Sequence, residues 1–129
     1  MIEKYWIFKV FVLGNNNYTE WEQSLPARGR AKIGLFIRRL ANIKLWPPKL
    51  VFPIAVRGHS KIRELRIKGD KVQYRPLGCF GPNRGEFILL YGAYEKDDVF
   101  IPKDAPERAD DRRILMEAGK GYLKDYDDL

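Results

Sequence analysis

The stretch IRELRIKGDKVQYRPLGCFGPNRGEFILLYGAYEK, residues 62–96, decides the fold of this chain. It contains three runs rich in β-branched and aromatic side chains, Ile62–Lys68, Val72–Phe80 and Glu86–Lys96, which suit a pleated, half-buried surface. Short glycine-containing turns separate the runs, and their lengths are typical of antiparallel hairpins. The stretch therefore predicts a three-stranded antiparallel meander.

The side-chain pattern within these runs predicts which faces of the sheet are covered. Residues 87–91 of the last run are all apolar, so we expect both faces of that strand to be buried, as in the middle of a sheet. In the first run, alternation directs Leu65 and Ile67 to the core. The same alternation directs three charged side chains away from the core: Glu64, Arg66 and Lys68.

The residues that precede the meander predict a strand and two helices. Tyr5–Leu13 reads as a first strand, and Thr19-Glu20-Trp21-Glu22 has the form of a capping box that opens a short helix. Pro26 suits the first turn of a second helix. Asn42–Ser60, with its prolines, predicts a packed, extended loop. The apolar face of the second helix consists of Ile33, Phe36, Ile37, Leu40 and Ala41.

The residues that follow the meander predict a helix and a tail. Asp104 is an expected N-cap for a helix that continues to about Ala118. We expect residues 120–129 to form an acidic, solvated and mobile tail, which includes Asp125, Asp127 and Asp128. The whole chain, 1–129, is thus predicted to be one α+β domain. Its expected order is strand, two helices, three-stranded antiparallel meander and C-terminal helix, with the helices packed on one sheet.

Composition and charge bound the class of protein. Hydrophobic residues make up 45% of the 129 residues, enough for one compact core. Charged side chains interrupt the apolar amino terminus and no long apolar run exists, so we expect a cytoplasmic protein without a membrane span. The lone Cys79 is expected to be a buried apolar side chain. Residues 1–96 carry 18 Lys and Arg against 7 Asp and Glu, whereas residues 97–129 carry 6 against 10. The positive part of the chain is suited to attract a polyanion.

Several motifs in this region occur in an order that is known from one protein family. They are the runs Ile62–Lys68, Val72–Arg75 and Ile88–Lys96, followed by Pro102 and Glu107-Arg108-Ala109. A helical region before them, Leu25–Leu40, matches as well. With this set of motifs the chain resembles the RelE/ParE toxin superfamily, and it is most similar to the phage-derived HigB-like branch. The resemblance covers about 100 of the 129 residues.

This resemblance implies a toxin of a type II toxin–antitoxin module. Such a toxin is an endoribonuclease that enters the ribosomal A site and cuts messenger RNA without a metal or another cofactor. The ribose 2′-OH attacks the adjacent phosphate, and basic side chains take the place of a metal ion. The implied partners are the ribosome, its messenger RNA and a cognate antitoxin, expected to be a helix-turn-helix protein.

Three cations of the meander are the candidate catalytic residues. Arg66 and Arg75 suit the clamping of phosphate oxygens, because a guanidinium stays charged and binds them in a bidentate fork. Lys96 suits the role of acid or base. The hypothesis requires all three to meet in one shallow, open cleft, and Arg66 has the alternative of a surface ion pair with Glu64 or Asp70. The candidate RNA-binding residues are His59, Lys61, Arg63, Lys68 and Tyr94.

Some of these residues carry competing interpretations. His59 titrates closest to neutrality and is the obvious general base by chemistry, but it lies outside the matched motifs and is otherwise an ordinary loop histidine. Tyr94 is either a platform for a base or a half-buried strand residue.

The chain departs from the family pattern at several positions, and two other functions stay open. Tyr91 replaces a histidine of the family, Asp97 and Asp98 place negative charge beside the expected phosphate site, and Pro76 predicts a bulge. One alternative is a ParE-like poison of DNA gyrase. The other is a non-enzymatic phage or prophage accessory protein that binds nucleic acid or a protein.

Overall fold

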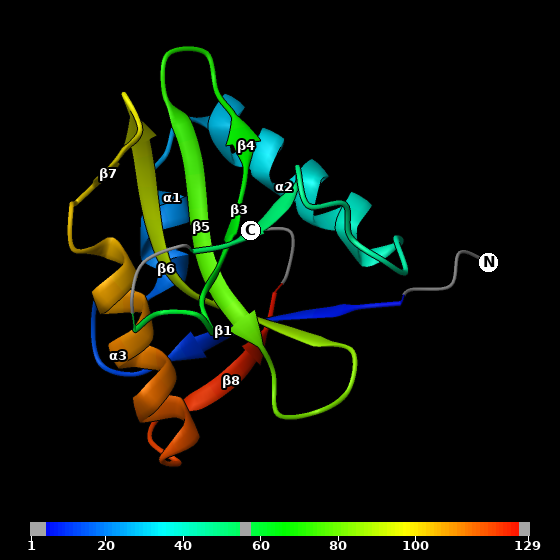
Figure 1. Cartoon of the computed structure of the whole chain (residues 1–129), viewed down its shortest axis with the longest axis vertical. Helices are drawn as coiled ribbons and strands as arrows, with labels where there is room; N and C mark the ends of the chain where they lie inside the picture. Colours follow the sequence, from blue (N-terminus) through cyan, green and yellow to red (C-terminus); the bar gives the residue numbers. More distant parts are fainter. Residues whose placement is uncertain (1–4, 55–57, 127–129) are drawn as a thin grey trace.

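A computed structural model describes residues 5–54 and 58–126. Within these ranges the chain forms one mixed β-sheet and three helices, so the fold class is α+β (Figure 1). The elements are β1 (Ile7–Val12), α1 (Tyr18–Gln23), α2 (Ala27–Ala41), β2 (Val51–Pro53), β3 (Arg63–Leu65), β4 (Ile67–Lys68), β5 (Gln73–Phe80), β6 (Glu86–Lys96), β7 (Val99–Ile101), α3 (Ala105–Glu117) and β8 (Tyr122–Asp125). The strand order is β2-β3-β5-β6-β1-β8, with β4 also paired with β5 and β7 with β6.

Strand β6 lies in the middle of the sheet, between β5 and β1. Its side chains alternate between two separate hydrophobic cores, because Phe87 and Leu89 belong to one core and Ile88 and Leu90 to the other. All four side chains are fully buried. The prediction that both faces of this strand are covered is therefore confirmed.

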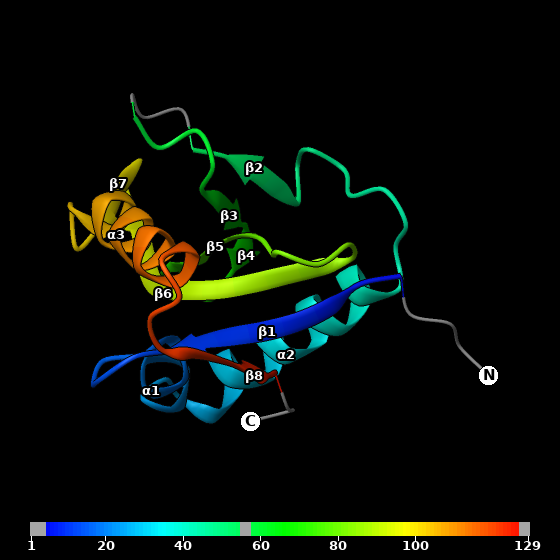
Figure 2. The ribbon, with the colours of Figure 1, turned by 90° about the horizontal axis from the view of Figure 1, so that it is seen from below.

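The helices cover both faces of the sheet. Helices α1 and α2 lie on one face and α3 lies on the opposite face (Figure 2), and we call these the α1–α2 face and the α3 face. Helix α2 places Ile33, Ile37 and Leu40 in the first core, at the spacing that the sequence predicts. Helix α3 contributes Ala105 and Ala109 to the second core. These small side chains let the α3 backbone approach the sheet closely.

The first strand pairs in parallel with β6, from Ile7 opposite Glu86 to Val10 opposite Leu89. The strand prediction is confirmed, but the capping-box prediction is wrong. The N-cap of α1 is Asn17, whose side-chain amide accepts from the N–H of Leu13.

Two details of the helical pair also differ from the prediction. Glu22 is buried instead of reaching back over the first turn of α1. Pro26 is the N-cap of α2 and does not lie inside its first turn.

Strand β5 pairs antiparallel with its neighbours on both sides, which confirms the meander. The first strand of the meander is divided into β3 and β4 at Arg66. The backbone N–H of Arg66 donates to the carbonyl of Leu50 at 3.0 Å and therefore does not pair with β5. The residues after Leu50 form β2, antiparallel to β3. The segment that was expected to be a loop therefore contains an edge strand.

The β5–β6 ladder continues past Pro76, which lies opposite Gly92, and its register shifts one residue later, between Leu77 and Gly78. The irregularity predicted at Pro76 thus lies beside it. At the other end of β6, Asp97 and Asp98 form the turn into β7, and both have positive φ angles, 52° and 63°. Asp tolerates this backbone region better than most residues, so these two aspartates serve a tight hairpin.

The C-terminal helix is confirmed, with Asp104 as its N-cap and Ala118 as its C-cap. Residues 120–126 are largely exposed, as predicted, but residues 122–125 are not a free tail because they form a strand. Gly119 and Gly121 both have positive φ angles and turn the chain back, and β8 then pairs antiparallel with β1. Asp125 belongs to β8, while Asp127 and Asp128 lie outside the described residues.

Candidate functional site

Arg75 lies between carboxylates on two neighbouring strands. Its side chain is 8% exposed, and its Nε and Nη2 each lie 3.3 Å from a carboxylate oxygen of Glu95. Its Nη1 donates to the carbonyl of Tyr74 at 3.0 Å. On the other side, Glu64 Oε2 lies 3.9 Å from Arg75 Nε. The guanidinium is thus enclosed and already paired, with little surface left for a phosphate.

Glu64 is the centre of this charged network and its position corrects the sequence analysis. Its side chain was expected to point away from the core, but it is 5% exposed. Its Oε1 accepts from Arg66 Nε at 3.0 Å, and the Arg66 guanidinium also lies over the ring of Phe52, 4.0 Å from the centroid. Burial raises the pKa of the Glu64 carboxyl, although Arg66 and Arg75 oppose this effect.

The three candidate catalytic cations do not meet in one cleft. Along β6, Glu95 shares the α3 face with Ala93, whereas Tyr94 packs in the core of the α1–α2 face. Because side chains alternate along a strand, Lys96 points to the α1–α2 face, away from Arg75. Arg66 and Arg75 share the α3 face, but each lies against a carboxylate. The predicted cleft of Arg66, Arg75 and Lys96 is therefore wrong.

Two of the candidate RNA-binding residues lie apart from the others. Tyr94 packs against Trp21 and Tyr74, with ring centroids 5.7 and 6.1 Å apart, so its ring serves the core and is no open platform. Lys68 is exposed at the end of β4 opposite Gln73, while Lys61 and Arg63 lie at the other end of the β3–β4 edge.

His59 is held by a carboxylate of α3. Its Nδ1 lies 2.9 Å from Oδ2 of Asp110, and Asp110 Oδ1 accepts from Arg113 Nε at 2.6 Å. Asp110 is 9% exposed and His59 is 16% exposed. Burial alone would raise the pKa of the Asp110 carboxyl, but the hydrogen bonds from Arg113 and His59 lower it overall. The carboxylate therefore stays ionised and fixes the imidazole ring.

The second nitrogen of His59 faces outward. Its Nε2 lies 3.7 Å from Oε1 of Glu107, whose side chain is half exposed. This separation is longer than a hydrogen bond, and an exposed glutamate can rotate away. The arrangement, a carboxylate on one ring nitrogen and a reachable second nitrogen, is the one that general bases use.

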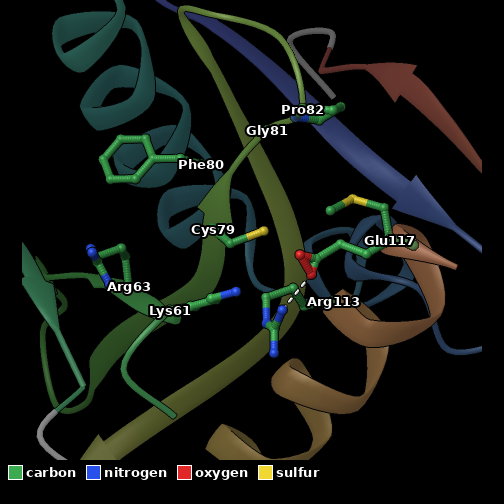
Figure 3. Close-up of a pocket in the computed structure, with 9 residues that line it drawn as sticks. Lys61, Arg63, Cys79, Phe80, Gly81, Pro82, Arg113 and Glu117 are labelled. Atoms are coloured by element: carbon green, nitrogen blue, oxygen red, sulfur yellow. Dashed lines mark hydrogen bonds and ion pairs between the residues drawn. The ribbon is translucent and has the colours of Figure 1, made fainter.

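A pocket of about 430 Å³ lies between the end of β5 and the last turns of α3 (Figure 3). Arg113, which donates to Asp110, lines this pocket, whereas His59 and Asp110 do not. Lys61 and Arg63 line it and form no ion pair with any described residue. Arg113, on the α3 wall, is neutralised by Asp110 and Glu117. The positive charge of the pocket thus comes from Lys61 and Arg63.

Cys79 lies at the floor of the pocket but brings no reactivity to it. The thiol is buried, as predicted, and burial raises its pKa to about 12. It stays protonated at neutral pH and is a poor nucleophile.

Three residues of this site were not predicted from the sequence: Phe80, Asp110 and Arg113. The i, i+3 spacing of Asp110 and Arg113 is visible in the sequence, but it predicts only an ordinary helical ion pair. No local pattern links Asp110 to His59, which lies 51 residues earlier. Phe80 was counted only as the last residue of a strand.

Comparisons with protein-family models, with curated proteins and with solved structures found no match for this chain. Among the described residues, no helix is long and apolar enough to cross a membrane. The same residues contain no group of three or more His, Cys, Asp and Glu side chains arranged to hold a metal ion.

Proposed function

We propose that this chain is the toxin of a type II toxin–antitoxin module and cleaves messenger RNA on the ribosome. The observation that carries the nuclease is the His59–Asp110 pair, which Arg113 connects to a pocket lined by the cations Lys61 and Arg63. The toxin assignment rests on the resemblance of the sequence motifs to those of the RelE/ParE toxins. The ribosome, the messenger RNA and a helix-turn-helix antitoxin are proposed partners on the strength of that resemblance.

In the proposed reaction His59 Nε2 takes the proton of a ribose 2′-OH. The freed oxygen attacks the adjacent phosphorus, the bond from phosphorus to the 5′-oxygen breaks, and a 2′,3′-cyclic phosphate forms. The departing 5′-oxygen takes up a proton from the ammonium group of Lys61, which lines the pocket. Arg63 and Lys61 offset the charge that grows on the non-bridging oxygens. The carboxyl group of Asp110 stays ionised and holds the imidazole ring of His59 in place.

This assignment replaces Arg66, Arg75 and Lys96 as catalytic residues. Arg75 and its carboxylates are enclosed, so a phosphodiester has no access to the guanidinium without breaking two ion pairs. His59 and Lys61 lie on the short loop before β3, and Lys61 lines the open pocket.

The test is His59→Gln in the full chain. Removal of a general base slows cleavage by about 10²–10⁴-fold, so we expect His59→Gln to abolish growth arrest and messenger cleavage by purified ribosomes. Asp110→Asn should lower kcat and leave KM unchanged, because Asp110 positions the ring and does not bind RNA. Lys71→Gln, an exposed cation in the turn after β4, is the matched control and should retain full activity.

Three outcomes would contradict the proposal. Full activity of His59→Gln would remove His59 from the reaction. Inhibition of DNA gyrase without messenger cleavage would favour the ParE-like function. Salt-sensitive RNA binding without toxicity or cleavage would favour a non-enzymatic accessory protein.

A further inference from the structure

A second pocket, of about 230 Å³, lies next to the larger pocket that Lys61 and Arg63 line, and the two share a wall. Arg63 and Phe80 line both pockets, and the Arg63 guanidinium lies 5.6 Å from the centroid of the Phe80 ring. Figure 3 shows both side chains on the same side of the larger pocket, with Lys61 pointing into it. We call Arg63 and Phe80 together the ridge.

The Phe80 ring is exposed but held firmly from behind. It is 46% exposed, although it packs against Trp46 at 5.9 Å and against Trp6 at 5.4 Å between ring centroids. Trp46 is fixed in turn, because its Nε1 donates to the carbonyl of Leu40 at 2.8 Å. The ridge is therefore a rigid aromatic surface with an open side.

Unpaired cations stand on both sides of the ridge. Lys61 lines the larger pocket and Lys44 lines the smaller one, and neither forms an ion pair with a described residue. Aromatic faces alternating with free cations are typical of surfaces that bind single-stranded nucleic acid, where bases stack and phosphates meet Lys or Arg. A peptide partner would need acidic groups at the spacing of Lys61 and Lys44 to use the same cations.

We propose that the ridge is the platform on which an unpaired RNA base stacks, with the flanking phosphates at Lys61 and at Lys44. The inference rests on the proposed function for the choice of RNA, and it adds the substrate class: single-stranded RNA with an accessible base. In an A-form duplex the base faces are covered by their neighbours, so paired RNA cannot use the ridge.

The test measures the affinity of the full chain for two fluorescent RNAs by anisotropy, an eight-nucleotide oligoadenylate and a fully paired hairpin. The protein carries His59→Gln so that the RNA stays intact. Phe80→Leu keeps the apolar volume and removes the ring face, and we expect it to weaken oligoadenylate binding about 5–100-fold. Binding of the hairpin, which rests on charge alone, should change less than twofold.

Phe52→Leu is the matched control, because Phe52 also lies beneath an arginine but outside both pockets. It should leave both affinities unchanged. Thermal unfolding of each variant shows whether it is folded. If Phe80→Leu does not fold, Arg63→Gln provides the same comparison, with an expected loss of the same order for oligoadenylate.

The inference is overturned if Phe80→Leu binds oligoadenylate as tightly as the parent, or if the parent prefers the hairpin. These failures are distinct from a failure of the proposed function. If cleavage depends on His59 but binding does not depend on Phe80, the ridge is not the binding platform and the proposed nuclease still holds. If binding depends on Phe80 but the wild-type chain cleaves no RNA, the ridge is a binding platform and the proposed nuclease function is contradicted.

Discussion

The guanidinium of Arg75 sits between two carboxylates on neighbouring strands, and this position decides what its removal would do. Arg75→Met leaves Glu95 without its ion-pair partner in a poorly solvated position, and leaves Glu64 with Arg66 alone. Breaking a buried ion pair from one side costs about 3–5 kcal/mol, so we expect that loss in the free energy of unfolding measured with urea. Arg66→Met removes a cation that is 39% exposed and leaves the buried Glu64 beside Arg75, so we expect a smaller loss than for Arg75→Met. If the Arg75→Met protein is fully stable but no longer cleaves RNA, Arg75 has a catalytic role and not a structural one.

Glu64 shows where single-residue prediction stops. Alternation gave the correct direction for Leu65 and Ile67, which are both buried. The same alternation puts Glu64 on the α3 face, opposite Leu77. That face was expected to be open, but Ile54 and Ile62 join Leu77 in a core there. Alternation tells which side of a sheet a residue takes, and only the path of the rest of the chain tells whether that side is covered.

At the scale of elements, the buried carboxylate of Glu22 in α1 forms hydrogen bonds with Tyr126, the residue that follows β8. Tyr126 Oη lies 3.1 Å from both carboxylate oxygens of Glu22, and Tyr18 Oη donates to the same group at 2.8 Å. A hydrogen bond to a charged group contributes about 1.5–3 kcal/mol, so Tyr126→Phe should lower the unfolding free energy by that amount. Amide exchange of β8 should become faster. Tyr122→Phe, on the exposed side of the same strand, is the control. Equal effects of the two substitutions would contradict this role of Glu22.

Long, strongly patterned elements could be predicted and short edge strands could not. Strand β6 has eleven residues with a continuous apolar centre, and its predicted bounds match the structure. Strands β7 and β8 have three and four residues and pair with the longer strands β6 and β1, whereas β2 pairs with β3, and both of these have three residues. The capping-box prediction at Thr19–Glu22 is wrong because the start of α1 is set by a contact outside the motif. Asn17 is held at the start of α1 by the N–H of Leu13, a contact outside the local motif.

For the molecule as a whole, the sequence predicted the kind of surface but not its place. The surplus of cations in residues 1–96 and the importance of Lys61 and Arg63 were expected, and both line the larger pocket. The site also needs Asp110, from a helix that carries much of the acidic charge and looks unfit for RNA. Arg113 forms an ion pair with Asp110, and His59 lies within hydrogen-bond distance of the same carboxylate. Because His59 and Asp110 are 51 positions apart, their contact leaves no local signal in the sequence.

The dependence of RNA binding on salt tests whether the pockets or the overall charge attract the ligand. Each phosphate that a cation contacts on a single strand contributes about −0.7 to the slope of log K against log salt concentration. Lys44, Lys61 and Arg63 therefore predict a slope of about −2 for oligoadenylate, and changing all three to Gln should bring it close to zero. Changing Lys71, Lys103 and Lys120 to Gln removes the same net charge at exposed positions outside both pockets. If that control flattens the slope equally, the basic character of the chain acts through its total charge, and neither pocket is a site.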